Sequence, residues 1–102
     1  QLLQNYPNPF NPETWIPFGL TESQSIQIAI YSADGDLVRS LSLGELPAGS
    51  YLTPDRAAYW DGQDQNGRRV SSGIYFYQLQ SDGLLGSKLS PLSNPRKMII
   101  VK

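Results

Sequence analysis

The stretch SIQIAIYSADGDLVRSLSL, residues 25–43, carries the clearest fold signal in the chain. Its isoleucines occupy alternate positions from Ile26 to Ile30, a period of two that is typical of a strand with one face in a core and one face nearer water. Asp34 and Gly35 follow, and this pair favours a type I′ turn because both residues tolerate positive φ angles. Apolar residues then resume. The stretch therefore predicts an antiparallel β-hairpin.

The returning strand of this hairpin, residues 37–43, does not keep a strict alternation. Its apolar residues Val38 and Leu41 stand three positions apart. An extra residue in one strand of an antiparallel pair shifts the side chains in this way and increases the local twist. We therefore expect a β-bulge or a twist in this strand.

Strand signals recur on both sides of the hairpin. Residues 15–20 alternate, and Pro17 favours an edge strand because proline cannot donate to a neighbouring strand. A short strand with Trp60 in the core precedes the turns predicted at Asn66-Gly67 and Asp82-Gly83. The remaining strands are expected near Tyr51 and at residues 73–81 and 96–102. About seven short antiparallel strands, with no stretch of sustained helical spacing, predict an all-β sandwich.

The segment NYPNPFNPET, residues 5–14, cannot start a helix or lie in the middle of a sheet, because it contains three prolines within six residues. Two interpretations are open: a disordered linker, or an ordered leader in which Tyr6 and Phe10 pack against the sandwich. We divide the chain into a proline-rich leader, residues 1–14, which packs on the domain or links to it, and a β-sandwich, residues 15–102. Together they form a single domain.

The composition excludes several functional classes. The chain contains no cysteine and no histidine, which removes disulfides, thiolate metal sites, the commonest general base and the commonest imidazole ligand. Eight basic and nine acidic residues give a net charge of −1, so no basic excess indicates nucleic-acid binding. The first residue is Gln1 rather than Met, and no signal peptide is recognisable, so we expect a fragment of a longer protein.

Asp61, Asp64 and Asn66 are the candidate metal ligands, because their oxygens stand at short spacing and suit a hard cation such as calcium. The spacing differs from that of an EF-hand, and both aspartates can instead bond the backbone of their own turn. We keep calcium as a weak candidate. The two carboxylates lie on one short loop and do not imply the facing pair of a glycosidase. We therefore expect no catalytic residue and no cofactor.

The aromatic residues permit two interpretations. Trp15, Trp60 and the six tyrosines could form a sugar-binding platform on an outer face. They could equally pack inside, since a sandwich of this size needs most of its aromatic side chains in the core, and aromatic alternation is ordinary in strands.

Several short motifs follow one another from the leader to the last residue. They are YPNPFNP at residues 6–12, TxIxFxL at 14–20, IYxxxGxxVRxL at 30–41, LPAGSY at 46–51, WDGxDxxG at 60–67, VxSGxYxYxL at 70–79 and KMxIxK at 97–102. As an ordered set they resemble the type A C-terminal sorting domains of type IX secretion cargo, which are related to the immunoglobulin-like domain of the flagellar hook-capping protein. The segments 52–58 and 84–95 are longer than in that family and are expected to be loop insertions.

The resemblance implies an immunoglobulin-like β-sandwich with a non-catalytic role. Such a C-terminal module would direct a larger cargo protein through the periplasm and across the outer membrane of a Gram-negative bacterium, to be secreted or held at the cell surface. Its partners would be the outer-membrane secretion translocon, a processing peptidase and the upstream cargo domain of the same chain. It would bind no nucleic acid and act as a monomer. The alternative is a structural or carbohydrate-binding accessory domain of an extracellular hydrolase.

In the family that the chain resembles, the sorting signal lies mostly in the last strands. The residues that would carry it here are Gly73, Tyr75, Lys97, Met98, Ile100 and Lys102. A terminal strand with an exposed edge and flanking lysines could be bound by strand addition. The same lysines could instead protect that edge against aggregation.

Overall fold

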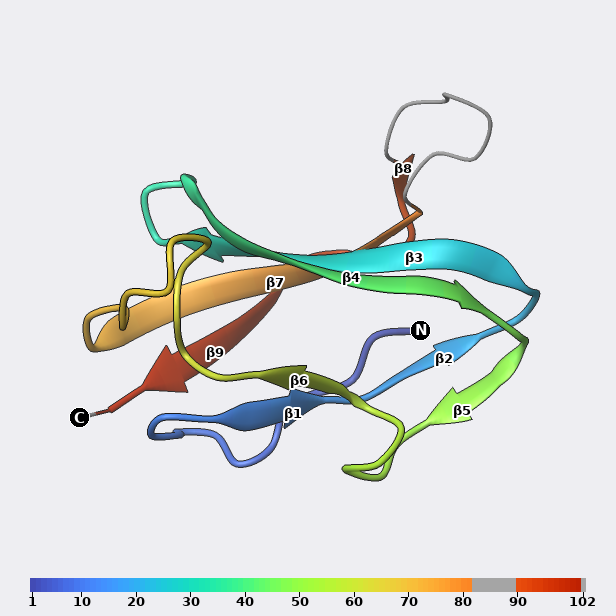
Figure 1. The fold of residues 1–102 in the computed structure, drawn as a ribbon, viewed down its shortest axis with the longest axis horizontal. Helices are drawn as coiled ribbons and strands as arrows, with labels where there is room; N and C mark the ends of the chain where they lie inside the picture. The colour runs from blue at the N-terminus through green and yellow to red at the C-terminus, as the bar shows by residue number, and fades with distance from the viewer. Residues whose placement is uncertain (82–89, 102) are drawn as a thin grey trace.

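The chain forms a β-sandwich (Figure 1). The computed structural model describes residues 1–81 and 90–101 of the 102-residue chain. These residues contain nine strands and no helix. Among them there is consequently no helix of the length and apolarity that crossing a membrane requires.

The larger sheet has five antiparallel strands. They are β3 (Gln24–Ser32), β4 (Leu37–Leu46), β7 (Gly73–Ser81), β8 (Ser90–Pro91) and β9 (Arg96–Ile100). The strand order is β4-β3-β7, and both β8 and β9 pair with β7 on its other side. β7 therefore lies in the middle of the sheet, while β4 and β9 lie at its two sides.

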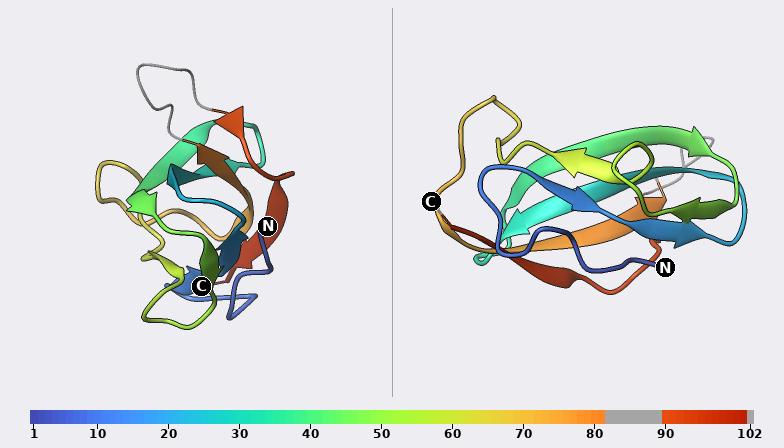
Figure 2. Two further views of the ribbon diagram at one scale, coloured as in Figure 1. Left: turned by 90° about the vertical axis from the view of Figure 1, so that its right-hand side faces the viewer. Right: turned by 90° about the horizontal axis from the view of Figure 1, so that it is seen from below.

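The second layer is built from short strand pairs below the larger sheet (Figures 1 and 2). Its strands are β1 (Thr14–Ile16), β2 (Phe18–Leu20), β5 (Gly49–Tyr51) and β6 (Ala58–Trp60). β1 pairs with β6 and β2 pairs with β5, both antiparallel. The nine strands exceed the expected seven because Pro17 divides one predicted strand into β1 and β2, and because β8 forms in the segment 84–95, which was not counted among the seven.

The hairpin of β3 and β4 is confirmed, and so is its bulge. The register between the two strands shifts twice, at Val38 and at Leu43. The predicted type I′ turn is wrong. The amide of Gly35 donates to the carbonyl of Ser32, so the central turn residues are Ala33 and Asp34. Gly35 follows with a φ of 91°, the arrangement of a type I turn closed by a glycine bulge.

Pro17 does not mark an edge strand, because the leader lies along the outer side of β1 and β2. Tyr6 and Trp15 exchange two backbone hydrogen bonds of 2.8 Å, and the amide of Leu3 donates to the carbonyl of Pro17 over 3.1 Å. Pro17 has no amide hydrogen to return to Leu3. The Leu3 carbonyl instead accepts the hydroxyl of Tyr77 over 2.8 Å, so a side chain replaces the missing backbone donor.

The core lies between the two layers and is formed by the inward residues of both. Tyr75, Tyr77 and Leu79 alternate inward along β7 as predicted. Trp60 is fully buried, which confirms its predicted core position. The leader also reaches this core, since Phe10 is 2% exposed and its ring meets that of Trp60 edge-on at 5.7 Å. The turn predicted at Asp82-Gly83 lies outside the described residues.

Candidate partner-binding site

The predicted sorting residues come together at the pairing of β7 with β9. Gly73 lies opposite Ile100, and Tyr75 lies opposite Met98. Gly73 has a φ of 150°, a conformation that favours glycine and starts β7 beside the end of β9. The structure therefore joins four of the six predicted residues in two cross-strand pairs.

Three of these four residues are part of the core rather than of the surface. Met98 is fully buried, Ile100 is 3% exposed and Tyr75 is 7% exposed. The Tyr75 ring packs edge-on against Trp60 at 6.0 Å, and its hydroxyl donates to the carbonyl of Ser71 over 2.8 Å. A partner cannot reach these side chains while the sandwich is folded. Their first role is to hold the last strand in place.

Among the predicted residues that the structure describes, Lys97 alone has an exposed side chain. It lies opposite Phe76 of β7, on the outer face of the larger sheet. Lys102 lies outside the described residues, so nothing follows for it from the structure.

The outer edge of β9, which was expected to be exposed, is occupied by the leader. The Ile99 amide donates to Asn8 Oδ1 over 2.9 Å, and the Ile99 carbonyl accepts the Phe10 amide over 3.0 Å. The Val101 amide donates to the carbonyl of Phe10 over 3.0 Å. These bonds make Phe10 and Ile100 a parallel bridge. The expectation of a free edge for strand addition is therefore wrong from Ile99 to Val101.

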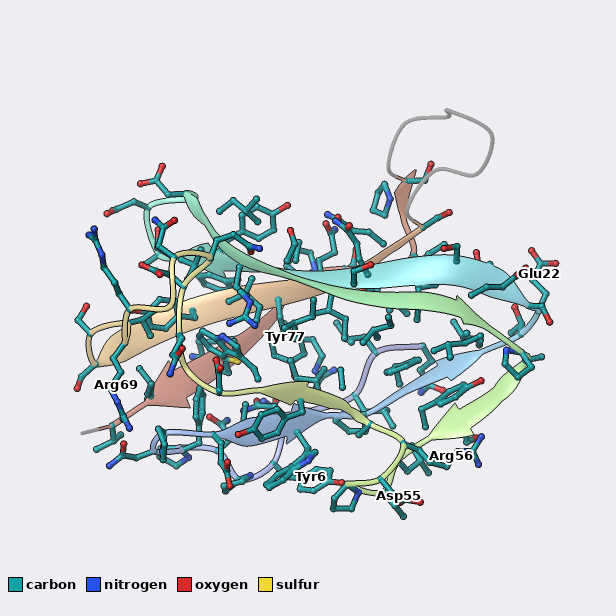
Figure 3. The ribbon with its side chains drawn as sticks, in the orientation of Figure 1. Tyr6, Glu22, Asp55, Arg56, Arg69 and Tyr77 are labelled. Atoms are coloured by element: carbon teal, nitrogen blue, oxygen red, sulfur yellow. The ribbon has the colours of Figure 1, made fainter. Side chains whose placement is uncertain are left out.

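A polar cluster behind this edge binds the leader around Tyr77, which lies between the two layers (Figure 3). The Tyr77 hydroxyl accepts the Asn5 amide over 2.9 Å and donates to the Leu3 carbonyl. Burial raises the pKa of Tyr77, and the hydrogen bond from the Asn5 amide and the nearby Arg96 guanidinium only partly offset this effect. The Asn5 side chain, itself 2% exposed, donates to Thr14 Oγ1 over 3.0 Å. The cluster thus satisfies buried polar groups where the chain has no regular strand.

Two further residues, Gln4 and Asn8, hold the leader against β9, and no sequence pattern had indicated them. Asn8 accepts the amide of a residue 91 positions away. Gln4 likewise donates to the Lys97 carbonyl over 3.0 Å and accepts from Arg96. No local pattern distinguishes a turn-forming asparagine from one that caps a distant strand. Only the fold brings these partners together.

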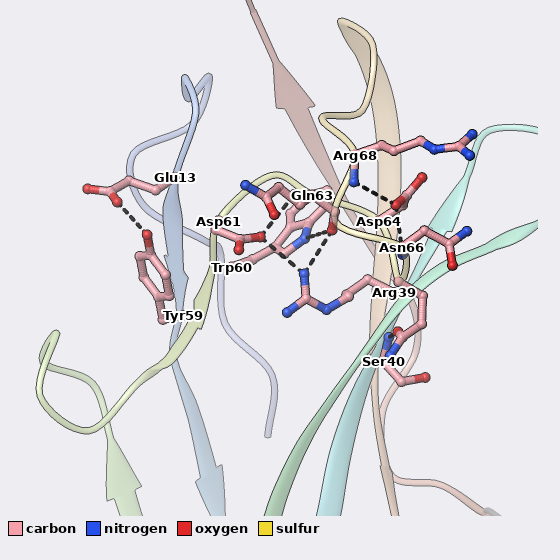
Figure 4. A network of polar contacts seen from close by, with 11 residues as sticks. Glu13, Arg39, Ser40, Tyr59, Trp60, Asp61, Gln63, Asp64, Asn66 and Arg68 are labelled. Carbon is pink, nitrogen blue, oxygen red and sulfur yellow. Dashed lines mark hydrogen bonds and ion pairs between the residues drawn. The ribbon is translucent and has the colours of Figure 1, made fainter.

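The calcium candidates have other bonds in this structure (Figure 4). Asp64 Oδ1 accepts the amides of Asn66 and Arg68, and these backbone bonds, that of Arg68 foremost, lower the pKa of Asp64. Asp61 Oδ1 accepts the Gln63 amide and pairs with Arg39 at 3.1 Å. No cluster of three or more acidic side chains that could hold a metal occurs among residues 1–81 and 90–101. The geometry is that of two side chains stabilising their own turns.

The aromatic residues divide between the core and the outer faces of both layers. Trp60 is buried and cannot serve a sugar platform. Tyr6, Trp15 and Tyr59 form a row across the leader, β1 and β6, with ring centroids 6.3 and 5.6 Å apart. The Tyr59 hydroxyl donates to Glu13 Oε2 over 2.6 Å, a bond that raises the pKa of Tyr59 (Figure 4). The row therefore ends at a carboxylate.

Comparison with protein families supports the observed fold. Residues 14–83 match the family described as FlgD Ig-like domain, which covers the sandwich from β1 through β7. No curated protein sequence matches the chain.

Among the solved structures with a similar fold are the following two. One is dimeric latent PorU from Porphyromonas gingivalis, with a TM-score of 0.77, 22% identity, and coverage of 98% of this chain and 9% of PorU. The other is FlgD from P. aeruginosa, with a TM-score of 0.60, 24% identity, and coverage of 81% of this chain and 57% of FlgD. At these identities the likeness shows the fold alone. In each case the chain corresponds to a part of the longer protein.

Proposed function

Because the chain belongs to the FlgD Ig-like domain family, we propose that it serves as a non-catalytic sorting module. The module directs a larger cargo protein across the outer membrane, where the cargo is secreted or held at the cell surface. Its partners are the outer-membrane secretion translocon and a processing peptidase, and the cargo domain precedes it in the same chain. It acts as a monomer and binds no nucleic acid.

The observation that carries this proposal is the contact between the two ends of the motif set. The YPNPFNP leader and the KMxIxK end are more than 80 residues apart in the sequence, yet Asn8 and Phe10 bond the backbone of Ile99 and Val101. Neither motif has a catalytic or metal-binding composition. Their direct contact supports the view that they act as one recognition unit.

Export of a reporter tests the proposal. The full chain is fused to the C-terminus of a fluorescent protein with a periplasmic signal peptide, in a host with a type IX system. We expect the reporter at the cell surface or in the medium, where added protease can reach it. The same reporter without the chain should stay in the periplasm. A periplasmic reporter with the intact, folded chain would contradict the proposal.

A second candidate function, carbohydrate binding, is favoured by the row of Tyr6, Trp15 and Tyr59. Aromatic faces bind the C–H faces of sugar rings, and the Glu13 carboxylate beside Tyr59 could accept a sugar hydroxyl. Tyr59 is 46% exposed, which leaves its ring accessible.

A glycan array decides this second candidate. Binding should be lost in Tyr59→Ala and retained in Leu37→Ala, which changes an exposed apolar residue on another surface. If neither the native chain nor the control binds any glycan, the aromatic row has only a packing role.

A further inference from the structure

The outer face of β7 and β9 presents a row of apolar side chains. Successive residues of a strand point to opposite faces, so the residues that alternate with buried Met98 and Ile100 point outward. These are Lys97, Ile99 and Val101. Ile74 lies directly opposite Ile99 and is 44% exposed, while Val101 is 48% exposed.

The leader extends this apolar face into a groove. The groove has a volume of about 470 Å³ and is lined by Pro7, Pro9, Phe10, Asn11 and Val101. Its floor is fixed, because Phe10 is buried and bonded to β9 through its backbone. Val101 belongs to both the groove and the outer face. The two features therefore form one surface.

The charge on this surface is a single exposed cation. Lys97 stands two residues before Ile99 on the same outward side of β9. Within the described part of the chain, the one ion pair joins Arg39 to Asp61, so no described carboxylate neutralises Lys97. The groove at Val101 and the unpaired ammonium of Lys97 lie on the same side of the strand, four residues apart. Together they are complementary to an extended segment that carries an apolar side chain and, further along, a carboxylate.

We propose that this surface, formed by Ile74, Lys97, Ile99, Val101 and the Pro7–Pro9 groove, docks a segment of the secretion machinery. The segment inserts an apolar side chain into the groove and presents an acidic side chain to Lys97. This inference rests on the proposed sorting function and names the part of the module that is read. Recognition then uses the outer face of the last strand rather than its edge.

Three alternatives fit the surface less well. Strand addition at β9 would have to displace Phe10 from the core. An anionic membrane attracts clusters of cations, whereas this surface has one exposed lysine and the chain has a net charge of −1. A symmetric contact with a second copy would pair the surface with itself, and its residues supply no carboxylate for Lys97.

A matched pair of double variants tests the docking surface in the reporter fusion. Ile74→Ser with Val101→Ser removes the two exposed apolar side chains of the surface. Leu37→Ser with Leu52→Ser removes two side chains that are 58% and 46% exposed elsewhere on the molecule. We expect export to fall about tenfold or more in the first double variant, as for residues that anchor an interface, and to stay near the native level in the second.

The lysine is tested separately through its charge. Lys97→Glu should lower export, because it places a carboxylate opposite the acidic side chain of the partner. Lys97→Arg keeps the positive charge, and its export should stay near the native level. Thermal melts of all variants show whether the sandwich remains folded. Lys97 takes part in the fold through its backbone, which pairs with Phe76 of β7 and accepts the side-chain amide of Gln4.

The outcomes separate this inference from the proposed function. If the native fusion is not exported, the sorting function itself fails. If the native fusion and both double variants are exported equally, sorting stands and the docking surface is wrong. Sedimentation of the native chain addresses the second copy: a dimer that dissociates in the Ile74→Ser, Val101→Ser variant would also overturn the proposal.

Discussion

The two ends of the chain lie side by side but are held in different ways. β9 is a regular strand, and its alternating residues place Met98 and Ile100 in the core. The leader forms only isolated bridges, at Leu2, Tyr6 and Phe10. Yet Phe10 is as deeply buried as Ile100.

This difference shows that a segment can be ordered without a repeating pattern. In β9 each residue contributes the same backbone pairing, so order comes from periodicity. In the leader, order comes from individual contacts: an aromatic anchor, a buried amide held by a tyrosine, and an asparagine that caps a distant strand. Each contact of the leader can therefore be removed by one substitution, which makes the comparison testable.

The largest effect is expected for Phe10→Ala. The substitution leaves a cavity against Trp60 and loosens the backbone bonds to Ile99 and Val101. We expect the free energy of unfolding to fall by about 3–5 kcal/mol, as for buried phenylalanines in general. Urea unfolding measures it. A change below about 0.5 kcal/mol, the range of ordinary surface substitutions, would show that the leader is peripheral to the fold.

Met98→Ala is the matched substitution in β9, the regular strand that the leader contacts. Met98 is fully buried, and truncation of a buried methionine costs about 2–5 kcal/mol. We expect a loss equal to or somewhat smaller than that of Phe10→Ala in the same urea experiment. A far larger loss for Met98→Ala would contradict the view that the two ends contribute comparably.

Tyr77→Phe tests the polar contact between the layers and keeps the ring in place. Without the hydroxyl, the buried Asn5 amide loses its acceptor and the Leu3 carbonyl loses its donor. An unsatisfied buried group costs about 1–3 kcal/mol, so the free energy of unfolding should fall by that amount. Tyr31→Phe, which changes a half-exposed tyrosine of β3, is the control and should cost less.

The stability of the native chain and that of the Tyr77→Phe variant should depend differently on pH. The pKa of Tyr77 is raised above its ordinary value of 10.0 by burial, so the folded state holds its proton more tightly than the unfolded state. Its contribution to stability is present below pH 10 and is lost as the pH rises from there through the folded pKa. The native chain should therefore lose stability more steeply above pH 10 than Tyr77→Phe does. If the free energy of unfolding fell equally with pH in the native chain and in Tyr77→Phe, the raised pKa of Tyr77 would be contradicted.

Much of the regular structure could be predicted from the sequence, because strands are determined by local alternation. β7 begins and ends where predicted, and the bulge near Val38 follows from a break in the pattern. The turn type at Gly35 could not be predicted, since a glycine after aspartate fits both a type I′ turn and a type I turn with a bulge.

The candidate site was only partly accessible to sequence reasoning. The motif resemblance selected Tyr75, Met98 and Ile100, which the structure places in the core. It did not select Ile74 or Val101, because an outward apolar residue on a strand has no distinctive local pattern. Which face a partner can reach depends on how the leader covers the edge of β9.

The smallest and most specific effect is expected for Asn8→Ala, which removes the side-chain acceptor of the Ile99 amide. The bond is exposed, so the free energy of unfolding should fall by about 0.5–1.5 kcal/mol.

Amide hydrogen exchange gives the sharper test of Asn8→Ala, because successive backbone amides along β9 point alternately to the leader and to β7. Exchange at Ile99 should accelerate, whereas Ile100, whose amide faces β7, should keep its protection. Asn11→Ala, in the same leader but exposed in the groove, should change neither. Equal acceleration at Ile99 and Ile100 would mean that β9 opens as a whole, and the leader would then hold the strand rather than cap its edge.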